Sequence, residues 1–415
     1  MIRVQNERGG QAGPVSAEPR ALAGVRVLDM SRVLAGPFAT QILADLGADV
    51  IKIEDPSRGD ETRQWGPPFA GTESAYFLSV NRGKRSVAVN LKTEAGQRIV
   101  RELAVRSDVL IENLKAGDMA RYGLDYERLA AENPRLIYCS ISGFGQTGPM
   151  RDVPGYDFAV QGMCGIMSVT GAPDGPPTKV GVAWVDILCG LYATVAIQAA
   201  LRARETTGRG QYIDISLWDA AVAAMVNLAQ AYLVSGREPG RLGNAHAQIV
   251  PYQMFPTADG YMVLAVGNDA QFERFCHVIG RPELAADERF ATNPARVKNR
   301  DVLIPLLEAA LKERTTGEWL GPLAAAKVPA APVWGLAQVL ESDLARHRGM
   351  RWPVDHPAAG AVDLVGSPLQ HMSLTPARLA GPPPTLGQHT GEVLSELLGF
   401  SAEDVRRLAE DGVVR

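Results

Sequence analysis

Hydrophobic runs alternate with amphipathic stretches along the first half of the chain. Consecutive apolar residues over roughly four to eight positions predict strands, and apolar residues recurring every three or four positions predict helices. Strands are predicted at residues 25–30, 49–54, 86–91, 108–113, 136–141 and 211–217, and helices at residues 36–46, 93–105 and 116–131. Because such alternation produces a parallel sheet with helices on both faces, the pattern predicts a doubly wound, Rossmann-like α/β fold.

The pattern changes in the second half of the chain. Residues 156–204 are mainly helical in character, apart from a glycine- and proline-rich loop at residues 171–177. Further elements are predicted as helices at residues 219–234, 270–279, 302–311, 316–325, 392–398 and 402–409, and as a strand at residues 261–266.

A chain of 415 residues exceeds the size at which a single core keeps growing, so two domains are expected. The predicted parts are a flexible N-terminal arm at residues 1–20, a large α/β domain beginning at residues 21–225, a smaller α+β domain at residues 226–335, and a return segment at residues 336–415 that completes the large domain.

Composition narrows the class of protein. The net charge of −4 gives no support to nucleic-acid or membrane-surface binding. Residues 1–19 lack the apolar segment of a signal peptide, and the apolar stretch at residues 220–234 is too short to span a bilayer. We therefore expect a cytoplasmic protein.

The four cysteines do not indicate a metal site. Cys139, Cys164, Cys189 and Cys276 are far apart, lie among apolar residues and lack the spacing of zinc ligands. They are predicted to be buried, reduced thiols, and no metal is expected.

One glycine motif suggests a different activity. The segment Gly143-Phe-Gly145-Gln-Thr-Gly148 has the spacing of a dinucleotide-binding motif and follows a predicted strand. A helix must begin there if its N-terminus is to face a pyrophosphate, but Pro149 and Pro154 oppose one. An NAD-dependent dehydrogenase is therefore a weak alternative, and the glycines are expected to shape a loop.

Asp186 is the unusual carboxylate of this sequence. It interrupts the otherwise uncharged segment 180–190, and burying an ionised carboxylate is costly unless the group is hydrogen-bonded or functional. It could be the N-cap of the helix that follows or a nucleophile. The two roles are compatible because a helix N-terminus stabilises a carboxylate.

Several segments together resemble the family III CoA-transferases, which include formyl-CoA transferase, carnitine CoA-transferase and α-methylacyl-CoA racemase. The likeness extends over residues 22–218 and returns at residues 386–390. Its segments are Val27-Leu-Asp-Met-Ser-Arg-Val-Leu-Ala-Gly-Pro37, Ile51-Lys-Ile-Glu54, Gly59-Asp60, Asn81-Arg-Gly-Lys-Arg-Ser86, Glu112-Asn113, Gly155-Tyr-Asp157, Asp174-Gly-Pro-Pro177 and Thr207-Gly-Arg-Gly-Gln211.

The resemblance implies an enzyme that uses an acyl-CoA thioester as substrate and holds no permanent cofactor. Asp186 would attack the donor thioester, and the reaction would proceed through an aspartyl anhydride and an aspartyl-CoA thioester. The family's CoA contacts carry over to Leu34, Ala35, Lys84, Asn113, Leu114, Arg121, Tyr156 and Asp157. The family also implies an interlocked, ring-like homodimer.

Two positions bear on the reaction and the acceptor. The racemases have a histidine where this chain has Tyr156, and a phenol is a poor proton acceptor near neutral pH, so transfer is favoured over racemisation. The segments around Asp174 and His246 resemble members that use succinyl-CoA and a dicarboxylic acid. Arg32 or His246 is expected to contact the remote carboxylate of the acceptor. A CoA-binding protein without activity is a further alternative.

Overall fold

The computed structural model describes residues 19–415, which separate into two compact units. The first unit contains the chain up to Pro154, Asp186–Ser216 and Gly349–Arg415. The second unit contains Gly155–Val185 and Leu217–Arg348. The expected arm at residues 1–20 lies almost wholly outside the described residues, and the expected domain limits remain predictions.

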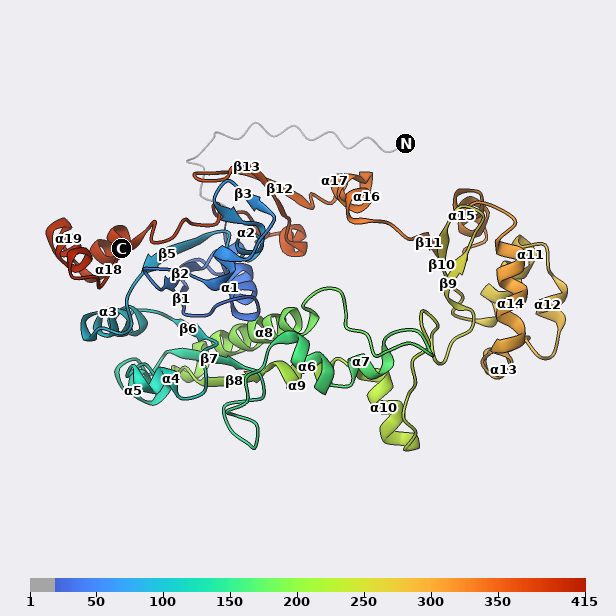
Figure 1. The fold of residues 1–415 in the computed structure, drawn as a ribbon, viewed down its shortest axis with the longest axis horizontal. Helices are drawn as coiled ribbons and strands as arrows, with labels where there is room; N and C mark the ends of the chain where they lie inside the picture. The colour runs from blue at the N-terminus through green and yellow to red at the C-terminus, as the bar shows by residue number, and fades with distance from the viewer. Residues whose placement is uncertain (1–18) are drawn as a thin grey trace. The chain divides into compact units, whose positions relative to one another are not determined.

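A six-stranded parallel sheet forms the centre of the first unit (Figure 1). The strands lie in the order β5 (Lys84–Ala88), β2 (Asp49–Glu54), β1 (Arg26–Asp29), β6 (Val109–Glu112), β7 (Ile137–Ser142) and β8 (Tyr212–Ser216). The first three strands of this sheet along the chain, β1, β2 and β5, lie on one side, and the next three, β6, β7 and β8, lie on the other, which is the order of doubly wound folds. The predicted central parallel sheet is confirmed, and its strand order reverses between β1 and β6.

The sheet forms because its strands are continuously apolar and can be covered on both faces. Leu28, Ile51 and Leu110 are fully buried in this core. The larger helices of the unit are α1 (Ala35–Asp45), α3 (Glu94–Val105), α5 (Tyr126–Glu132), α8 (Trp184–Thr207), α18 (Thr390–Leu398) and α19 (Ala402–Glu410). The first two residues of α8, Trp184 and Val185, are assigned to the second unit.

Shorter elements complete the first unit. Two antiparallel hairpins are formed by β3 (Phe69–Ala70) with β4 (Glu73–Ser74), and by β12 (Arg351–His356) with β13 (Gly360–Val365). The short helices are η1 (Glu61–Gln64), α2 (Ala75–Val80), α4 (Asp118–Arg121) and η2 (Pro368–His371).

Strand β5 begins two residues earlier than the hydrophobic pattern predicted. Its first residues, Lys84 and Arg85, are charged and were not assigned to the strand. The structure neutralises both, because Lys84 binds the buried Asp29 and Arg85 binds Asp49, Glu392 and Glu396. Tertiary ion pairs therefore extend the strand beyond its apolar part.

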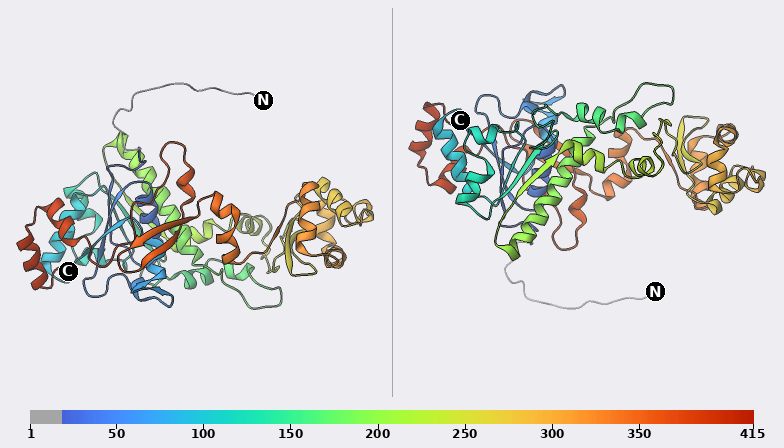
Figure 2. Two further views of the ribbon diagram at one scale, coloured as in Figure 1. Left: turned by 90° about the horizontal axis from the view of Figure 1, so that it is seen from above. Right: turned by 90° about the horizontal axis from the view of Figure 1, so that it is seen from below.

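The second unit contains a three-stranded antiparallel sheet in the order β11 (Ala330–Pro332), β10 (Tyr261–Ala265) and β9 (Tyr252–Pro256). Helices lie along one side of this sheet (Figure 2), and Phe255 and Trp319 are buried between the two layers. These helices are α11 (Asp269–Val278), α12 (Glu283–Ala286), α13 (Asn293–Lys298), α14 (Arg300–Leu311) and α15 (Thr316–Ala325). The unit also contains α6 (Asp157–Met163), α7 (Ile166–Val169), α16 (Leu336–Glu341) and α17 (Asp343–His347).

The single helix predicted at residues 219–234 was wrong. The segment forms two helices, α9 (Leu217–Ala223) and α10 (Val226–Ser235), whose axes differ by 73°. Val226 has φ of +37°, which is incompatible with a continuous right-handed helix. Apolar periodicity continues through the break, so the pattern alone did not reveal it.

Candidate active site

A cavity of about 200 Å³ opens at the carboxyl ends of strands β1, β2 and β5 in the first unit. It lies beside the position where the strand order reverses, and doubly wound sheets bind their ligands there. Its lining residues are Met30, Ser31, Arg32, Lys52, Ile53, Glu54, Asp55, Gly59, Asp60, Val89, Asn90, Leu91, Lys92, Leu114 and Tyr122. We call this the sheet-edge cavity.

The loop between β1 and α1 forms one wall of the sheet-edge cavity. The amide N–H of Arg32 donates to Oδ1 of Asn113 at 2.8 Å, and Nδ2 of Asn113 donates to the carbonyl of Arg32 at 2.7 Å. A Cβ atom on Gly36 would lie 2.2 Å from Cβ of Ser31, so only glycine permits this turn. The structure thus brings Arg32, Asn113 and the start of α1 at Ala35 together.

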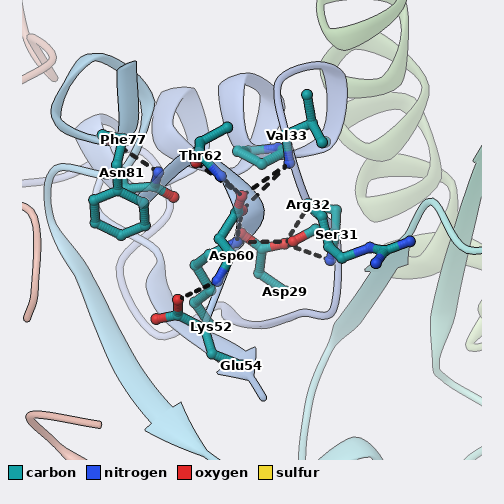
Figure 3. Close-up of polar contacts among 12 residues, drawn as sticks. Asp29, Ser31, Arg32, Val33, Lys52, Glu54, Asp60, Thr62, Phe77 and Asn81 are labelled. Carbon is teal, nitrogen blue, oxygen red and sulfur yellow. Dashed lines mark hydrogen bonds and ion pairs between the residues drawn. The ribbon is translucent and has the colours of Figure 1, made fainter. Parts of the chain in front are cut away.

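Two buried ion pairs lie beneath this loop. Figure 3 shows Lys52, Asp60 and Asp29, which belong to these pairs. Nζ of Lys52 is 2.9 Å from Oδ2 of Asp60, and Nζ of Lys84 is 3.0 Å from Oδ2 of Asp29. Burial raises the pKa of Asp29, but the ammonium groups of Lys84 and Lys52 and two hydroxyl donors lower it to about 2. Burial also raises the pKa of Asp60, and Lys52 reverses this effect, so its pKa lies below the ordinary value.

Lys84 does not line the sheet-edge cavity. Its ammonium group donates to Asp29, Asn81 and the Pro37 carbonyl, and burial lowers the pKa of Lys84 to about 8. The residue stands at the amino end of β5, whereas ligands bind at the carboxyl end. Its side chain is therefore engaged in the interior of the first unit, and its contact with CoA remains a prediction.

Lys92 lines the cavity and was missed by the sequence analysis. It follows the carboxyl end of β5 and precedes α3, together with Asn90. The rule that basic side chains beyond strand carboxyl ends suit phosphorylated ligands would have selected it. The family resemblance placed the basic CoA contact instead at Lys84, before the strand.

Of the predicted contact residues Leu114 and Arg121, the first lines the cavity and the second does not. Leu114 lines the cavity directly, and its amide N–H donates to the carboxyl group of Glu112 at 2.8 Å. Arg121 lies at the end of α4, is largely exposed and pairs with Asp118 at 3.0 Å. Its neighbour Tyr122 reaches the cavity.

The second unit holds Tyr156 and Asp157 at the start of α6. Tyr156 is exposed, whereas Asp157 is buried and accepts hydrogen bonds from Nε2 of Gln161 at 3.0 and 2.9 Å. Oε1 of the Gln161 side chain accepts the amide N–H of Val180 at 2.8 Å. Gln161 therefore ties Asp157 to the segment that leads along the chain into α8.

Asp186 lies in the first turn of α8, two residues after the helix begins at Trp184. It is half-buried. The interpretation of Asp186 as the N-cap residue was wrong, because Asp186 lies inside the helix. The partial positive charge of a helix N-terminus still favours its ionised form, which is the form that a nucleophilic carboxylate requires.

His246 is half-buried in the second unit. Its ring lies against Tyr252 with centroids 5.3 Å apart, and Nδ1 accepts the amide N–H of Gln248 at 3.0 Å. Arg300 donates to the carbonyl of His246 at 3.2 Å. Arg32, by contrast, belongs to the first unit and pairs with Glu61 at 3.0 Å.

The cysteines and the glycine motif were also interpreted from the sequence. All four cysteines are buried, and none forms a disulfide, as predicted. No helix begins within Gly143–Gly148, which forms a loop held by donation from the amide of Gln146 to Asp214. The glycines shape a loop, as the sequence analysis expected.

Comparison with known proteins relates this architecture to one family. Residues 22–390 match the family described as CoA-transferase family III. A succinate–glutarate CoA-transferase of Agrobacterium fabrum is 47% identical over 382 residues, covering 91% of this chain and 95% of that protein. A succinyl-CoA:glutarate CoA-transferase of Mus musculus is 45% identical, covering 95% of this chain and 90% of that protein.

A solved structure agrees over the same length. The crystal structure of a CAIB/BAIF family protein from Brucella suis superposes with a TM-score of 0.81 at 46% identity. The match covers 91% of this chain and 99% of that chain.

Proposed function

This chain belongs to CoA-transferase family III, and on that premise we propose that it transfers coenzyme A from succinyl-CoA to a dicarboxylic acid such as glutarate. The observation that carries the proposal is the match, over nearly the whole chain, to two relatives whose names state this reaction. The reaction exchanges one thioester for another, so it needs a group that can hold the acyl group and then CoA in turn.

Asp186 is the proposed nucleophile. Its carboxylate attacks the donor thioester and releases the CoA thiolate, which leaves an acyl-aspartyl anhydride. The thiolate then attacks the aspartyl carbonyl, releasing succinate and forming an aspartyl-CoA thioester. The acceptor carboxylate attacks this thioester to form a second anhydride, and the thiolate attacks the acceptor's carbonyl. The new acyl-CoA leaves, and Asp186 is regenerated as a carboxylate.

CoA is proposed to bind along the sheet-edge cavity and the segments around it. Lys92 at the rim supplies a positive charge for a phosphate. The family contacts at Leu34, Ala35, Asn113, Leu114 and Arg121 belong to the first unit, and those at Tyr156 and Asp157 to the second. The predicted contact at Lys84 also belongs to the first unit, where its ammonium group binds Asp29.

A dicarboxylic acceptor has a second carboxylate that a cationic group can hold. We assign this contact to Arg32 or His246, the two residues expected from the sequence. Arg32 is exposed at the rim of the sheet-edge cavity, and its partner Glu61 is equally exposed, so the acceptor can displace a weak ion pair.

Transfer is favoured over α-proton exchange at this site. A racemase needs an acid and a base on opposite faces of the α-carbon. Tyr156 stands where the racemases have histidine, and the ordinary pKa of a phenol near 10 makes it a poor base at neutral pH. A CoA-binding protein without activity is the other alternative, and turnover of an acyl-CoA with a carboxylic acid would exclude it.

The active form is proposed to be a cytoplasmic homodimer. Apolar side chains are exposed on α8, at Leu191, Tyr192 and Val195, and on α10, at Tyr232, Leu233 and Val234. No residue of α10 is buried. Several exposed apolar side chains on one helix are typical of an interface between subunits.

The test is incubation of the purified protein with succinyl-CoA and a panel of carboxylic acids, followed by mass spectrometry of the acyl-CoA products. We expect glutaryl-CoA or another dicarboxylyl-CoA from the wild type, and a loss of activity of at least about 10³-fold in Asp186→Asn. Equal activity in the two proteins would contradict the role of Asp186. No thioester from any acid would contradict transferase activity, and exchange of the α-proton in deuterated water would then support racemisation.

A further inference from the structure

One residue of the loop that borders the sheet-edge cavity has an unusual backbone. Val33 has φ of +68°, in the left-handed region. A β-branched residue is rarely found there because its side chain crowds the adjacent carbonyl. Strained backbone persists only where the surroundings fix it, and it concentrates at functional sites. The question is what fixes Val33.

The carboxylate of Asp60 is the group that reaches Val33 (Figure 3). The amide N–H of Val33 points between the two carboxylate oxygens, with its nitrogen 3.3 Å from each. Oδ2 of Asp60 also pairs with Lys52, whose ammonium donates to the carbonyl of Ser31 at 2.8 Å. The ion pair thus holds the loop on both sides of Arg32, and all of these groups except Val33 line the cavity.

We propose that Asp60 is a positioning residue whose carboxylate holds Val33 in the left-handed conformation, and that this conformation shapes the CoA-binding wall of the sheet-edge cavity. The proposal rests on the proposed function, because it takes the ligand of this cavity to be coenzyme A. Asp60 acts through the backbone and not by touching the substrate.

A simpler role for Asp60 is that of N-cap for η1. Oδ1 does accept the amide and the hydroxyl of Thr62, at 3.0 and 2.8 Å. An N-cap residue needs only one side-chain oxygen as acceptor and no cationic partner, so asparagine serves as well as aspartate. Here donors approach from both sides, and an amide side chain offers only one acceptor oxygen. Asp60→Asn therefore loses either the cap or the contact with Lys52, and it keeps only one of the two oxygens that face the amide of Val33.

The test is a double-mutant cycle read by titration calorimetry with coenzyme A. Wild type, Asp60→Asn, Val33→Gly and the double variant are compared. We expect Asp60→Asn to weaken binding about tenfold, because the strained loop then populates other conformations. Glycine adopts positive φ without strain, so Val33→Gly alone should change Kd by less than about threefold.

The double variant decides the matter. If Asp60 acts through Val33, glycine makes Asp60 dispensable, and the double variant should bind within about threefold of wild type. A double variant as weak as Asp60→Asn would overturn the proposal, and so would an Asp60→Asn protein that binds like wild type. Should Asp60→Asn fail to fold, Asp60→Glu, which displaces the carboxylate, enters the same cycle under the same criteria.

Two controls separate the causes of failure. Asp45→Asn breaks another buried ion pair, that with Arg82 at 2.6 Å, and Val33→Gly should not reverse its effects. A wild-type protein that does not bind coenzyme A would contradict the proposed function. The positioning role would then be judged from Tm, which Val33→Gly should raise in the Asp60→Asn background and leave nearly unchanged in the wild type.

Discussion

Burial changes the chemistry of single side chains beside the sheet-edge cavity. Glu112 stands at the carboxyl end of β6, immediately before Asn113, which holds the backbone of Arg32. It is bonded to the hydroxyl of Ser140 and the amide of Leu114, and within residues 19–415 no cation is among its hydrogen-bond partners. Burial therefore raises the pKa of Glu112 to about 7, and the negative charges of Asp118 and Asp214 add to the effect.

This raised pKa predicts a pH-dependent stability. The folded state binds a proton more tightly than the unfolded state, in which the pKa is near 4.5. The contribution of Glu112 is thus fully present below about pH 4.5 and is lost as the pH rises through about 7. Glu112→Gln, which resembles the protonated acid, should raise the free energy of unfolding by up to about 3 kcal/mol at pH 8 and leave it unchanged at pH 4.5.

Urea unfolding of wild type and Glu112→Gln at several pH values between 4.5 and 8 measures this difference. Glu127→Gln, at an exposed position of α5, serves as the matched control and should show no such trend. A Glu112→Gln effect of the same size at every pH would mean that the substitution alters packing and that Glu112 is not protonated in the folded protein.

At the scale of elements, the last part of the chain completes the edge of the central sheet. The amide of His389 donates to the carbonyl of Ser86 at 2.9 Å, and the amide of Ser86 donates back to Nδ1 of His389 at 3.1 Å. The amide of Ala88 donates to Oγ1 of Thr390 at 3.1 Å. The return segment therefore satisfies backbone groups of the edge strand β5 that would otherwise lack partners.

Ser86 is the residue on which this docking depends. Its hydroxyl donates to Oε1 of Glu54 at 2.6 Å and accepts the amide of Gly387 at 2.8 Å. Ser86→Ala leaves both groups without this partner in a buried position, so it should lower the free energy of unfolding by about 2 kcal/mol. Chemical denaturation checks the value.

Ser79→Ala is a suitable control for this substitution. The Ser79 hydroxyl makes one hydrogen bond, to the carbonyl of Tyr76 at 2.7 Å, and the residue is exposed. We expect a change within about 0.5 kcal/mol. A loss in Ser86→Ala no larger than that in Ser79→Ala would show that the return segment is held mainly by other contacts.

At the scale of the whole molecule, the exposed apolar helices require an explanation. Helix α8 is long and apolar enough to cross a membrane by length and composition, and α9 with α10 would qualify as a bent pair. Only 39% of the most apolar window of α8 is buried. Because α8 also carries Asp186 in its first turn, contact with a second subunit explains its apolar surface better than contact with lipid.

Mass photometry tests the proposed homodimer. Leu233 is 73% exposed on α10, and Leu233→Glu would place a charge in the proposed interface. We expect a shift from dimer to monomer at submicromolar concentration, whereas Leu233→Met should remain dimeric. A wild-type protein that is monomeric under these conditions would contradict the homodimer, and a dimeric Leu233→Glu would place the interface elsewhere.

The central sheet, the family and the importance of Asp186 could all be predicted from the sequence alone. Strands such as 49–54 are recognisable because a strand buried on both faces must be apolar throughout, and this requirement is local. Asp186 was recognisable because a carboxylate in an apolar segment is costly wherever the segment folds. The break between α9 and α10 was not, since Val226 carries no sequence signal for positive φ.

Which basic and acidic residues form ion pairs could be seen only in the folded chain. The local sequence does not distinguish three lysines, Lys52, Lys84 and Lys92. In the structure the first two form buried ion pairs with Asp60 and Asp29, and the third lines the sheet-edge cavity. Asp60 lies 27 residues from Val33 along the chain and reaches its amide only in the folded state. Ion pairs and strained loops depend on groups distant in sequence, so their positions follow from how the strands are ordered and not from local pattern.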